Sequence, residues 1–218
     1  TPLREGGSLP ALVEADDGRL YVLKFRGAGQ GTKALVAELV AGELMRALGL
    51  PVPELVLADL DSRFGSAERD PEIQDLLRAS AGQNLAMAYL SGALAFDPLL
   101  TPPPAPALAS RVLWCDAFLT NVDRTPRNPN LLLLEGHLWL IDHGACLYMH
   151  HTWHDYITRS RSRFPQVQEH ILLPFASEIA QADADLSARI TPDLVQSVVA
   201  LIPDSWLEPQ QAGFAHPD

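Results

Sequence analysis

The sequence predicts an α+β fold in two lobes, and three observations predict it. The first half of the 218-residue chain combines short strand-like segments with one helix of apolar periodicity. A proline-rich stretch at 97–107, DPLLTPPPAPA, then breaks the pattern, because proline cannot sit inside a helix or a central strand. The second half contains an apolar helix, a polar loop, a hairpin pattern and a mostly helical end. We therefore expect a first lobe at 1–90 and a second at 91–218, together forming one domain.

The first lobe is expected to begin with a hairpin. Residues 12–15 and 20–25 alternate like strands, and the Asp-Asp-Gly between them is a strong turn signal. Residues 32–50 show helical spacing, with Leu35, Leu39, Leu44 and Leu48 on one stripe and Gly49 as the stop. The other predicted elements are extended chain leading into a strand, a short helix and a short strand, at 51–60, 71–79 and 84–90.

The second lobe is expected to be mostly helical. Residues 108–120 are apolar nearly all round, which predicts a buried helix. Residues 131–134 and 137–141, joined by Glu-Gly, predict a second hairpin. Three further helices are predicted at 164–173, 175–190 and 191–202, the last with Thr191 as its N-cap and Pro192 in its first turn.

Composition narrows the class of protein. A formal net charge of −11 argues against sequence-independent binding to nucleic acid, which needs a basic surface. Hydrophobic content of 47% with 20% charged residues is typical of a soluble globular chain. No apolar run reaches the roughly 18 residues that span a membrane. Cys115 and Cys146 both lie in apolar surroundings, which favours two buried, reduced thiols and a cytoplasmic protein.

Five polar side chains lie at positions in the predicted elements and loops where they could take part in a reaction. Lys24 alternates with apolar residues on a predicted strand, and Glu38 lies in the helix that follows. Asp123 comes directly after the apolar helix, Asn128 five residues later, and Asp142 at the end of the run LWLI. Each has an ordinary explanation too: an outward strand lysine, a solvated helix glutamate, and turn-forming Asp and Asn residues.

Together these side chains match the needs of phosphoryl transfer from ATP. That reaction requires a cation on the phosphates, carboxylate and amide oxygens on magnesium, and a carboxylate that accepts the proton of a hydroxyl acceptor. Lys24 is the candidate for the cation on the phosphates, and Asn128 and Asp142 are the candidates for the magnesium ligands. Asp123 is the candidate for the carboxylate that accepts the proton. Glu38 could fix the ammonium group of Lys24.

The same residues resemble a known family. DRTPRN followed by LWLIDHG is similar to the catalytic and metal-binding loops of the HipA-like kinases, an arrangement shared with phosphoinositide lipid kinases. YVLKF and AELVAGELMRALGLPVP resemble that family's lysine strand and glutamate helix, in the same order. The resemblance runs from about residue 3 to residue 150. It implies a protein-kinase-like fold, with an antiparallel sheet and one helix in the small lobe and a mostly helical second lobe.

The resemblance also implies a role for each residue. Lys24 is expected on the ATP phosphates with Glu38 as its ion-pair partner, Asp123 as the catalytic base, and Asn128 and Asp142 as Mg²⁺ ligands. Gly6, Gly7 and Ser8 are expected to cover the phosphates with backbone N–H groups. The hinge that contacts adenine is expected at Met87, Ala88, Tyr89 and Leu90. The acceptor implied is a protein Ser/Thr hydroxyl, or the chain itself.

Some features depart from the pattern or leave alternatives open. The metal-binding triplet is Asp-His-Gly rather than Asp-Phe-Gly, and the glycine run RGAGQGTK follows Lys24 instead of preceding it. That run could also touch phosphate, with Lys33 as a helper. Asn130 competes with Asn128 for the metal, although spacing favours Asn128. Nucleotidyl transfer from the same ATP site and a non-catalytic nucleotide-binding role remain as alternatives.

The histidine-rich segment YMHHTWHDY is a separate feature. His150 and His154 have the i, i+4 spacing with which one helix can bind zinc, and His151 or Asp155 could add a ligand. No glutamate stands between them as the base of a metalloprotease would. The favoured interpretation is an aromatic, histidine-rich segment beside the active site.

Overall fold

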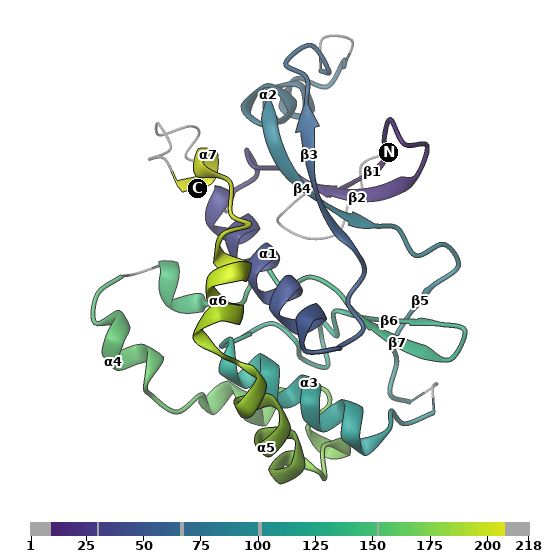
Figure 1. The fold of residues 1–218 in the computed structure, drawn as a ribbon. Coiled ribbons are helices and arrows are strands. Elements are labelled where there is room, and N and C mark those ends of the chain that lie inside the picture. Colours follow the sequence, from purple (N-terminus) through teal and green to yellow (C-terminus); the bar gives the residue numbers. More distant parts are fainter. Residues whose placement is uncertain (1–9, 30, 66–67, 100–101, 152, 208–218) are drawn as a thin grey trace. The chain divides into compact units, whose positions relative to one another are not determined.

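The computed structural model describes residues 10–29, 31–65, 68–99, 102–151 and 153–207. It confirms the α+β class, with two antiparallel sheets and several helices in these ranges (Figure 1). Contacts group the chain into two compact units. The first unit holds the described residues of Thr1–Val36, Glu54–Tyr89 and Ile202–Asp218, and the second holds Ala37–Pro53 and Leu90–Leu201. The expected lobes at 1–90 and 91–218 stay a prediction.

The first unit is built on a four-stranded antiparallel sheet. The strand order is β1-β2-β4-β3, with bounds Ala11–Glu14, Leu20–Lys24, Gly82–Ala88 and Leu55–Leu60 respectively. The predicted hairpin forms, and Gly18 at its turn adopts a φ of +74°. Helix α2 spans Pro71–Ala79, as predicted, and the Asp70 carboxylate caps it by accepting from the backbone N–H of Glu72. The helix α7, Asp204–Leu207, also belongs to this unit.

The first glycine of the run RGAGQGTK has a packing role. A Cβ on Gly27 would lie 2.7 Å from the Cβ of Ala79 and 2.9 Å from its carbonyl carbon, so the close approach to the end of α2 needs a glycine. The Gly27 N–H donates to the Ser80 hydroxyl at 3.1 Å, and the Arg26 N–H to the Asn84 side-chain oxygen at 2.8 Å. Phosphate contact by this run stays a prediction.

The second unit surrounds the larger apolar core. Its sheet has the order β5-β6-β7, with bounds Leu94–Ala95, Leu131–Leu134 and His137–Leu140. The helix α3, Pro106–Phe118, packs against α5, Ile179–Arg189 (Figure 1). The core gathers buried side chains from helix, sheet and loop, including Val112, Leu140, Leu172 and Leu186.

The long helix α1, Gly31–Ala47, contributes residues to both units. All four leucines of the predicted stripe, Leu35, Leu39, Leu44 and Leu48, are buried. The chain leaves the helix through Gly49, whose φ of +81° is one that glycine adopts without strain. The predicted helix, its buried face and its stop signal are therefore confirmed.

Several predicted elements differ in extent. The helix α3 is not buried all round, because Phe118 is half exposed and stacks on Trp114 along the outer face. Residues 164–173 contain the 3₁₀ turn η2, Pro165–Glu169, and a second turn, η3, follows at Leu173–Phe175. Pro174 lacks the N–H that an α-helix running through it would need, whereas Pro165 would stand in a first turn, where no such N–H is needed. The helix α5 begins at Ile179 rather than at 175.

The last of the predicted helices, α6, begins as predicted. It spans Pro192–Val199, and the Thr191 hydroxyl accepts from the Leu194 N–H at 3.2 Å. The short elements η1, α4 and α7 were not predicted; they lie at Tyr148–His151, Tyr156–Ser160 and Asp204–Leu207. Among the described residues, no helix combines the length and the apolar character needed to cross a bilayer.

Candidate active site

A tight turn folds the polar loop after α3 back on itself. The backbones of Thr125 and Asn128 exchange two N–H···O hydrogen bonds, both of 3.1 Å, around Pro126 and Arg127. Proline is favoured at the second position of such a turn, because its φ is already set. The turn returns Asn128 to Asp123, where its amide nitrogen donates to Asp123 Oδ2 at 2.6 Å. The five-residue spacing in the sequence therefore closes into a direct contact.

The Asp123 carboxylate is held on one oxygen. Asn130 also donates to Oδ2, at 3.3 Å, and the Asp123 N–H donates to the side-chain oxygen of Asn121 at 3.1 Å. Within the described residues, no hydrogen bond reaches the other oxygen, Oδ1. The half-buried carboxylate is thus oriented through Oδ2, and Oδ1 is available to accept a proton.

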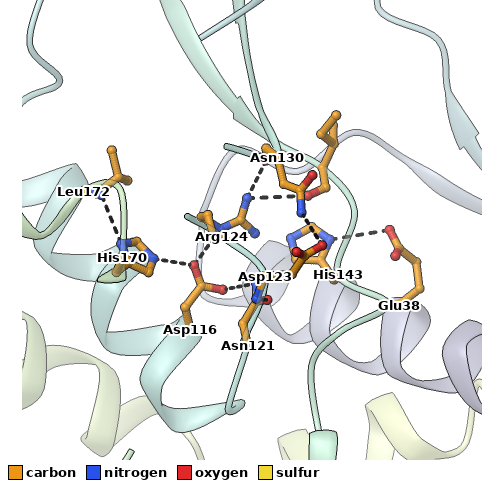
Figure 2. Close-up of polar contacts among 10 residues, drawn as sticks. Glu38, Asp116, Asn121, Asp123, Arg124, Asn130, His143, His170 and Leu172 are labelled. Atoms are coloured by element: carbon orange, nitrogen blue, oxygen red, sulfur yellow. Dashed lines mark hydrogen bonds and ion pairs between the residues drawn. The ribbon is translucent and has the colours of Figure 1, made fainter. Parts of the chain in front are cut away.

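A buried ion pair anchors this loop to α3 (Figure 2). Nε of Arg124 lies 2.6 Å from Oδ2 of Asp116, and both side chains are fully buried. Asn121 donates to Asp116 Oδ1 at 2.8 Å. Burial by itself raises the pKa of the Asp116 carboxyl, but the Arg124 guanidinium and the hydrogen bonds from His170 and Asn121 outweigh it and hold that pKa well below its usual range. Asp116 is therefore ionised at neutral pH.

His170 completes the cluster around Asp116. Its Nδ1 accepts the N–H of Leu172 at 3.0 Å, which leaves the ring proton on Nε2. Nε2 lies 3.0 Å from Oδ2 of Asp116, so it donates to the carboxylate. The Ile171 N–H donates in turn to the carbonyl of Arg124 at 3.1 Å. The segment before η3 is thereby tied to the loop that carries Asp123.

The other end of Arg124 connects the loop to the segment of Asp142. Nη1 donates to the carbonyl of Asn130 and, at 3.4 Å, to the carbonyl of Ile141. The Ile141 N–H also donates to the Asn130 carbonyl, at 3.1 Å. Asp142 follows immediately, half buried, with a φ of +54°. Left-handed backbone at a non-glycine residue is strained, and such residues cluster at functional sites.

Glu38 lies beside this segment in the second unit (Figure 2). Its side chain is 1% exposed, and its Oε1 lies 3.6 Å from Nδ1 of the fully buried His143. The explanation of Glu38 as a solvated helix residue is therefore wrong, because α1 turns this position toward the core. Neither ring nitrogen of His143 has a hydrogen bond among the described residues. The histidine of the Asp-His-Gly triplet thus packs against the predicted partner of Lys24.

The residues predicted to contact the nucleotide belong largely to the first unit. Lys24 ends β2, half buried, and faces Leu85 of β4 in the strand register. The predicted hinge falls at the end of β4 and just beyond it, at Met87, Ala88, Tyr89 and Leu90. Gly6, Gly7 and Ser8 lie outside the described residues. The roles of all these residues stay predictions.

The oxygens of Asn128 and Asp142 suit a hard cation. Asn128 must turn its NH₂ toward Asp123, because an ionised carboxylate only accepts, and this leaves its Oδ1 facing away. Mg²⁺ is commonly bound by one or two carboxylates together with substrate phosphates and waters. Two protein oxygens are therefore a fitting donor set for magnesium.

The described residues contain no group of three or more His, Cys, Asp or Glu side chains that could hold a metal. His150 is buried, whereas His154 is exposed. The turn η1 ends at His151 and α4 begins at Tyr156, so the helical i, i+4 spacing that a zinc pair needs is not formed.

The two cysteines lack the properties of nucleophiles. Cys115 and Cys146 are buried and free. Burial raises the pKa of the Cys115 thiol to about 12, and burial likewise raises the pKa of Cys146 well above its ordinary value. Neither side chain is a thiolate at neutral pH, which excludes them as catalytic nucleophiles.

The residues that hold the loop were not predicted from the sequence. Asp116 carries one usable signal, since a lone acid within the apolar run WCDAFL needs a buried partner. Arg124 stands next to Asp123 and could have been proposed as that partner. Nothing in the sequence marks His170, because its contact with Asp116 joins residues 54 positions apart.

Comparisons with known proteins identify the family and the fold. The model of a family described as HipA-like kinase matches residues 1–216. Among solved structures, the chain is similar to that of the Helicobacter pylori proinflammatory kinase CtkA, with a TM-score of 0.61 and 15% sequence identity. The similarity covers 94% of this chain and 84% of that one, and it confirms the predicted kinase-like fold. No curated protein matches the sequence.

Proposed function

The chain belongs to the HipA-like kinase family, as the resemblance of its loops predicted, and we propose that it transfers the γ-phosphoryl group of ATP to a hydroxyl acceptor. The main support for this proposal is the orientation of the Asp123 carboxylate, which Asn128 and Asn130 hold through Oδ2. Phosphoryl transfer depends on positioning and on charge stabilisation, both of which this loop is built to supply.

Asp123 is the proposed base. Its Oδ1 receives or orients the proton of the acceptor hydroxyl, while the two amides keep Oδ2 occupied. The buried Arg124–Asp116 pair holds the loop in place. The Asp123 carboxylate is therefore oriented before any acceptor binds. A protein Ser or Thr, or a residue of the chain itself, is the proposed acceptor.

Asn128 and Asp142 are the proposed ligands of Mg²⁺, which when bound neutralises charge on the phosphates. Lys24 is proposed to bind the phosphates and Glu38 to orient the Lys24 ammonium group. The backbone of Met87, Ala88, Tyr89 and Leu90 is proposed to contact adenine, and Gly6, Gly7 and Ser8 the phosphates. A buried Glu38 supports this assignment, because a buried carboxylate needs a compensating partner.

Incubation of the full chain with Mg²⁺ and γ-labelled ATP tests the proposed function. We expect label on the protein or release of labelled phosphate, and we expect EDTA to abolish both. If no label is transferred from γ-labelled ATP but label from α-labelled ATP becomes attached to the protein, the reaction is nucleotidyl transfer. If neither label is transferred although nucleotide binds, the chain is a non-catalytic binding protein and the proposal is wrong.

Replacing Asp142 with Asn should weaken magnesium-dependent nucleotide binding. Removing a carboxylate ligand is expected to raise the Kd for ATP in the presence of Mg²⁺ by about tenfold or more, with little change in EDTA. Asp155→Asn is the matched control, since Asp155 is also an aspartate at a φ of +54° and makes no capping hydrogen bond through its side chain. Calorimetric titration of both variants provides the comparison. Equal Kd values for the two variants would remove Asp142 from the metal site.

A further inference from the structure

A pocket of about 190 Å³ opens beside the loop that carries Asp123. Its wall is made by three segments of the second unit that are separated in the sequence. Thr120 and Val122 come from the loop, Tyr148 from η1, and Arg159, Ser162 and Arg163 from α4 and the turn that follows it. Val122 directly precedes Asp123 in the chain, so this pocket and the proposed base share one loop.

The wall of the pocket is positively charged. Arg159 is half buried and Arg163 exposed, and no acidic side chain is among the described residues that line it. This is notable in a chain with 27 acidic and 16 basic residues, whose surface is on average negative. Guanidinium groups bind carboxylates and phosphates through paired, charge-assisted hydrogen bonds. The chemistry of the wall therefore suits an anion.

The size of the pocket limits what it can hold. At about 190 Å³ it is smaller than the roughly 300–1,000 Å³ of sites that enclose a whole small ligand. It accommodates one side chain, and the rest of the bound molecule must lie outside. The half-exposed ring of Tyr148 and the partly buried ring of Phe164 give the wall an apolar part as well. These features fit one residue of a peptide better than a free metabolite.

Backbone strain at Thr120 supports a functional role for this wall. Thr120 has a φ of +53°, which is a marked outlier for a β-branched residue. Strain of this kind persists where the surrounding structure requires it. The strained residue links α3 to the catalytic loop and also lines the pocket.

We propose that this pocket binds an acidic residue of a protein acceptor, a carboxylate or phosphorylated side chain, close to the hydroxyl that is phosphorylated. The proposal rests on the proposed function, because it takes Asp123 as the base. An extended peptide advances about 3.3–3.6 Å per residue, so the acidic residue is placed among the positions that flank the accepting Ser or Thr. The chain is thus an acid-directed protein kinase.

Peptide binding without ATP tests the pocket independently of turnover. The probes are fluorescent Ser-centred peptides with Glu at flanking positions, the same peptides with Gln, and a third set with phosphoserine. We expect the Glu or phosphoserine peptides to bind about tenfold or more tightly than the Gln peptides to the full chain, by fluorescence anisotropy. Which of the two binds better distinguishes a carboxylate site from a phosphoryl site.

Substitutions assign the preference to the pocket. Arg159→Gln with Arg163→Gln should abolish the preference for acidic peptides, whereas Arg161→Gln should retain it. Arg161 is the matched control, since it lies between the two arginines, is exposed and does not line the pocket. Equal binding of Glu, phosphoserine and Gln peptides to the unaltered chain would overturn the proposal, as would a preference that survives in the double variant.

Failure of the pocket proposal and failure of the proposed function give different results. ATP turnover without discrimination between peptides would leave the kinase assignment standing and reject the acidic acceptor. Discrimination between peptides without transfer of γ-label would retain the pocket as an anion-binding site for peptides and reject the kinase assignment.

Discussion

Replacing Asp123 with Asn is expected to lower the rate of phosphoryl transfer by about 10²–10⁴-fold, the range by which a positioned general base accelerates a reaction. An asparagine keeps the size of the side chain, and its oxygen can still accept from Asn128 and Asn130. What is lost is the oxygen that takes the acceptor proton. We therefore expect kcat to fall while the Kd for ATP changes little.

Single-turnover rates and ATP titrations of the same preparation separate these two effects. Asp59→Asn is the control, because it makes the same chemical change at an exposed position of β3. Turnover should be unchanged in that variant. If Asp123→Asn keeps the full rate, Asp123 is not the base. If it loses ATP binding instead, its role lies in the nucleotide site.

Replacing Arg124 with Met is expected to lower the free energy of unfolding by about 3–5 kcal/mol, because the change leaves the buried Asp116 carboxylate without its cation. Denaturant unfolding measures the loss. Arg19→Met provides the contrast, since the Arg19–Glu54 pair is exposed and its removal should cost far less. A loss for Arg124→Met no larger than that for Arg19→Met would show that the buried pair does not stabilise the fold.

The double change Asp116→Leu with Arg124→Met separates stability from positioning. Replacing a buried ion pair by apolar side chains is often neutral, so part of the free energy of unfolding should return, reduced by the cost of the Asn121 and His170 donors that lose their acceptor. Transfer should nevertheless stay slow, because the hydrogen bonds from Arg124 to the carbonyls of Asn130 and Ile141 are gone. Recovery of the full rate together with stability would show that the pair has no positioning role.

The pH dependence of the Arg124→Met effect has a definite sign. In the unaltered chain the pKa of Asp116 is depressed, so its stabilisation is complete above the ordinary carboxyl pKa of about 3.9 and is lost as the pH falls below that value. Without Arg124, that pKa rises because the guanidinium no longer offsets burial, so the ionised carboxylate stabilises the fold less than in the unaltered chain as the pH rises. The loss of free energy should therefore be larger at pH 7 than at pH 4.

Local signals in the sequence determined much of the fold. The Asp-Asp-Gly and Glu-Gly turns marked both hairpins, the leucine stripe marked α1, and the bounds of α2 matched the prediction. The same holds for the contact of Asp123 with Asn128, because a turn through Pro126 closes it within six residues. These features depend on interactions between neighbours in the chain, and such interactions can be inferred from spacing and residue type.

Only the tertiary structure decided how the loop that carries Asp123 is supported. The partners of Asp116 come from the loop and from His170, and Glu38 lies against His143 of the Asp-His-Gly segment. The arginine-lined pocket likewise joins three segments that no sequence pattern connects. A charged residue within an apolar segment predicts that its side chain has a partner in the core, because desolvation of an unpaired charge is costly. It does not say which distant residue supplies that partner, since packing of the whole core selects it.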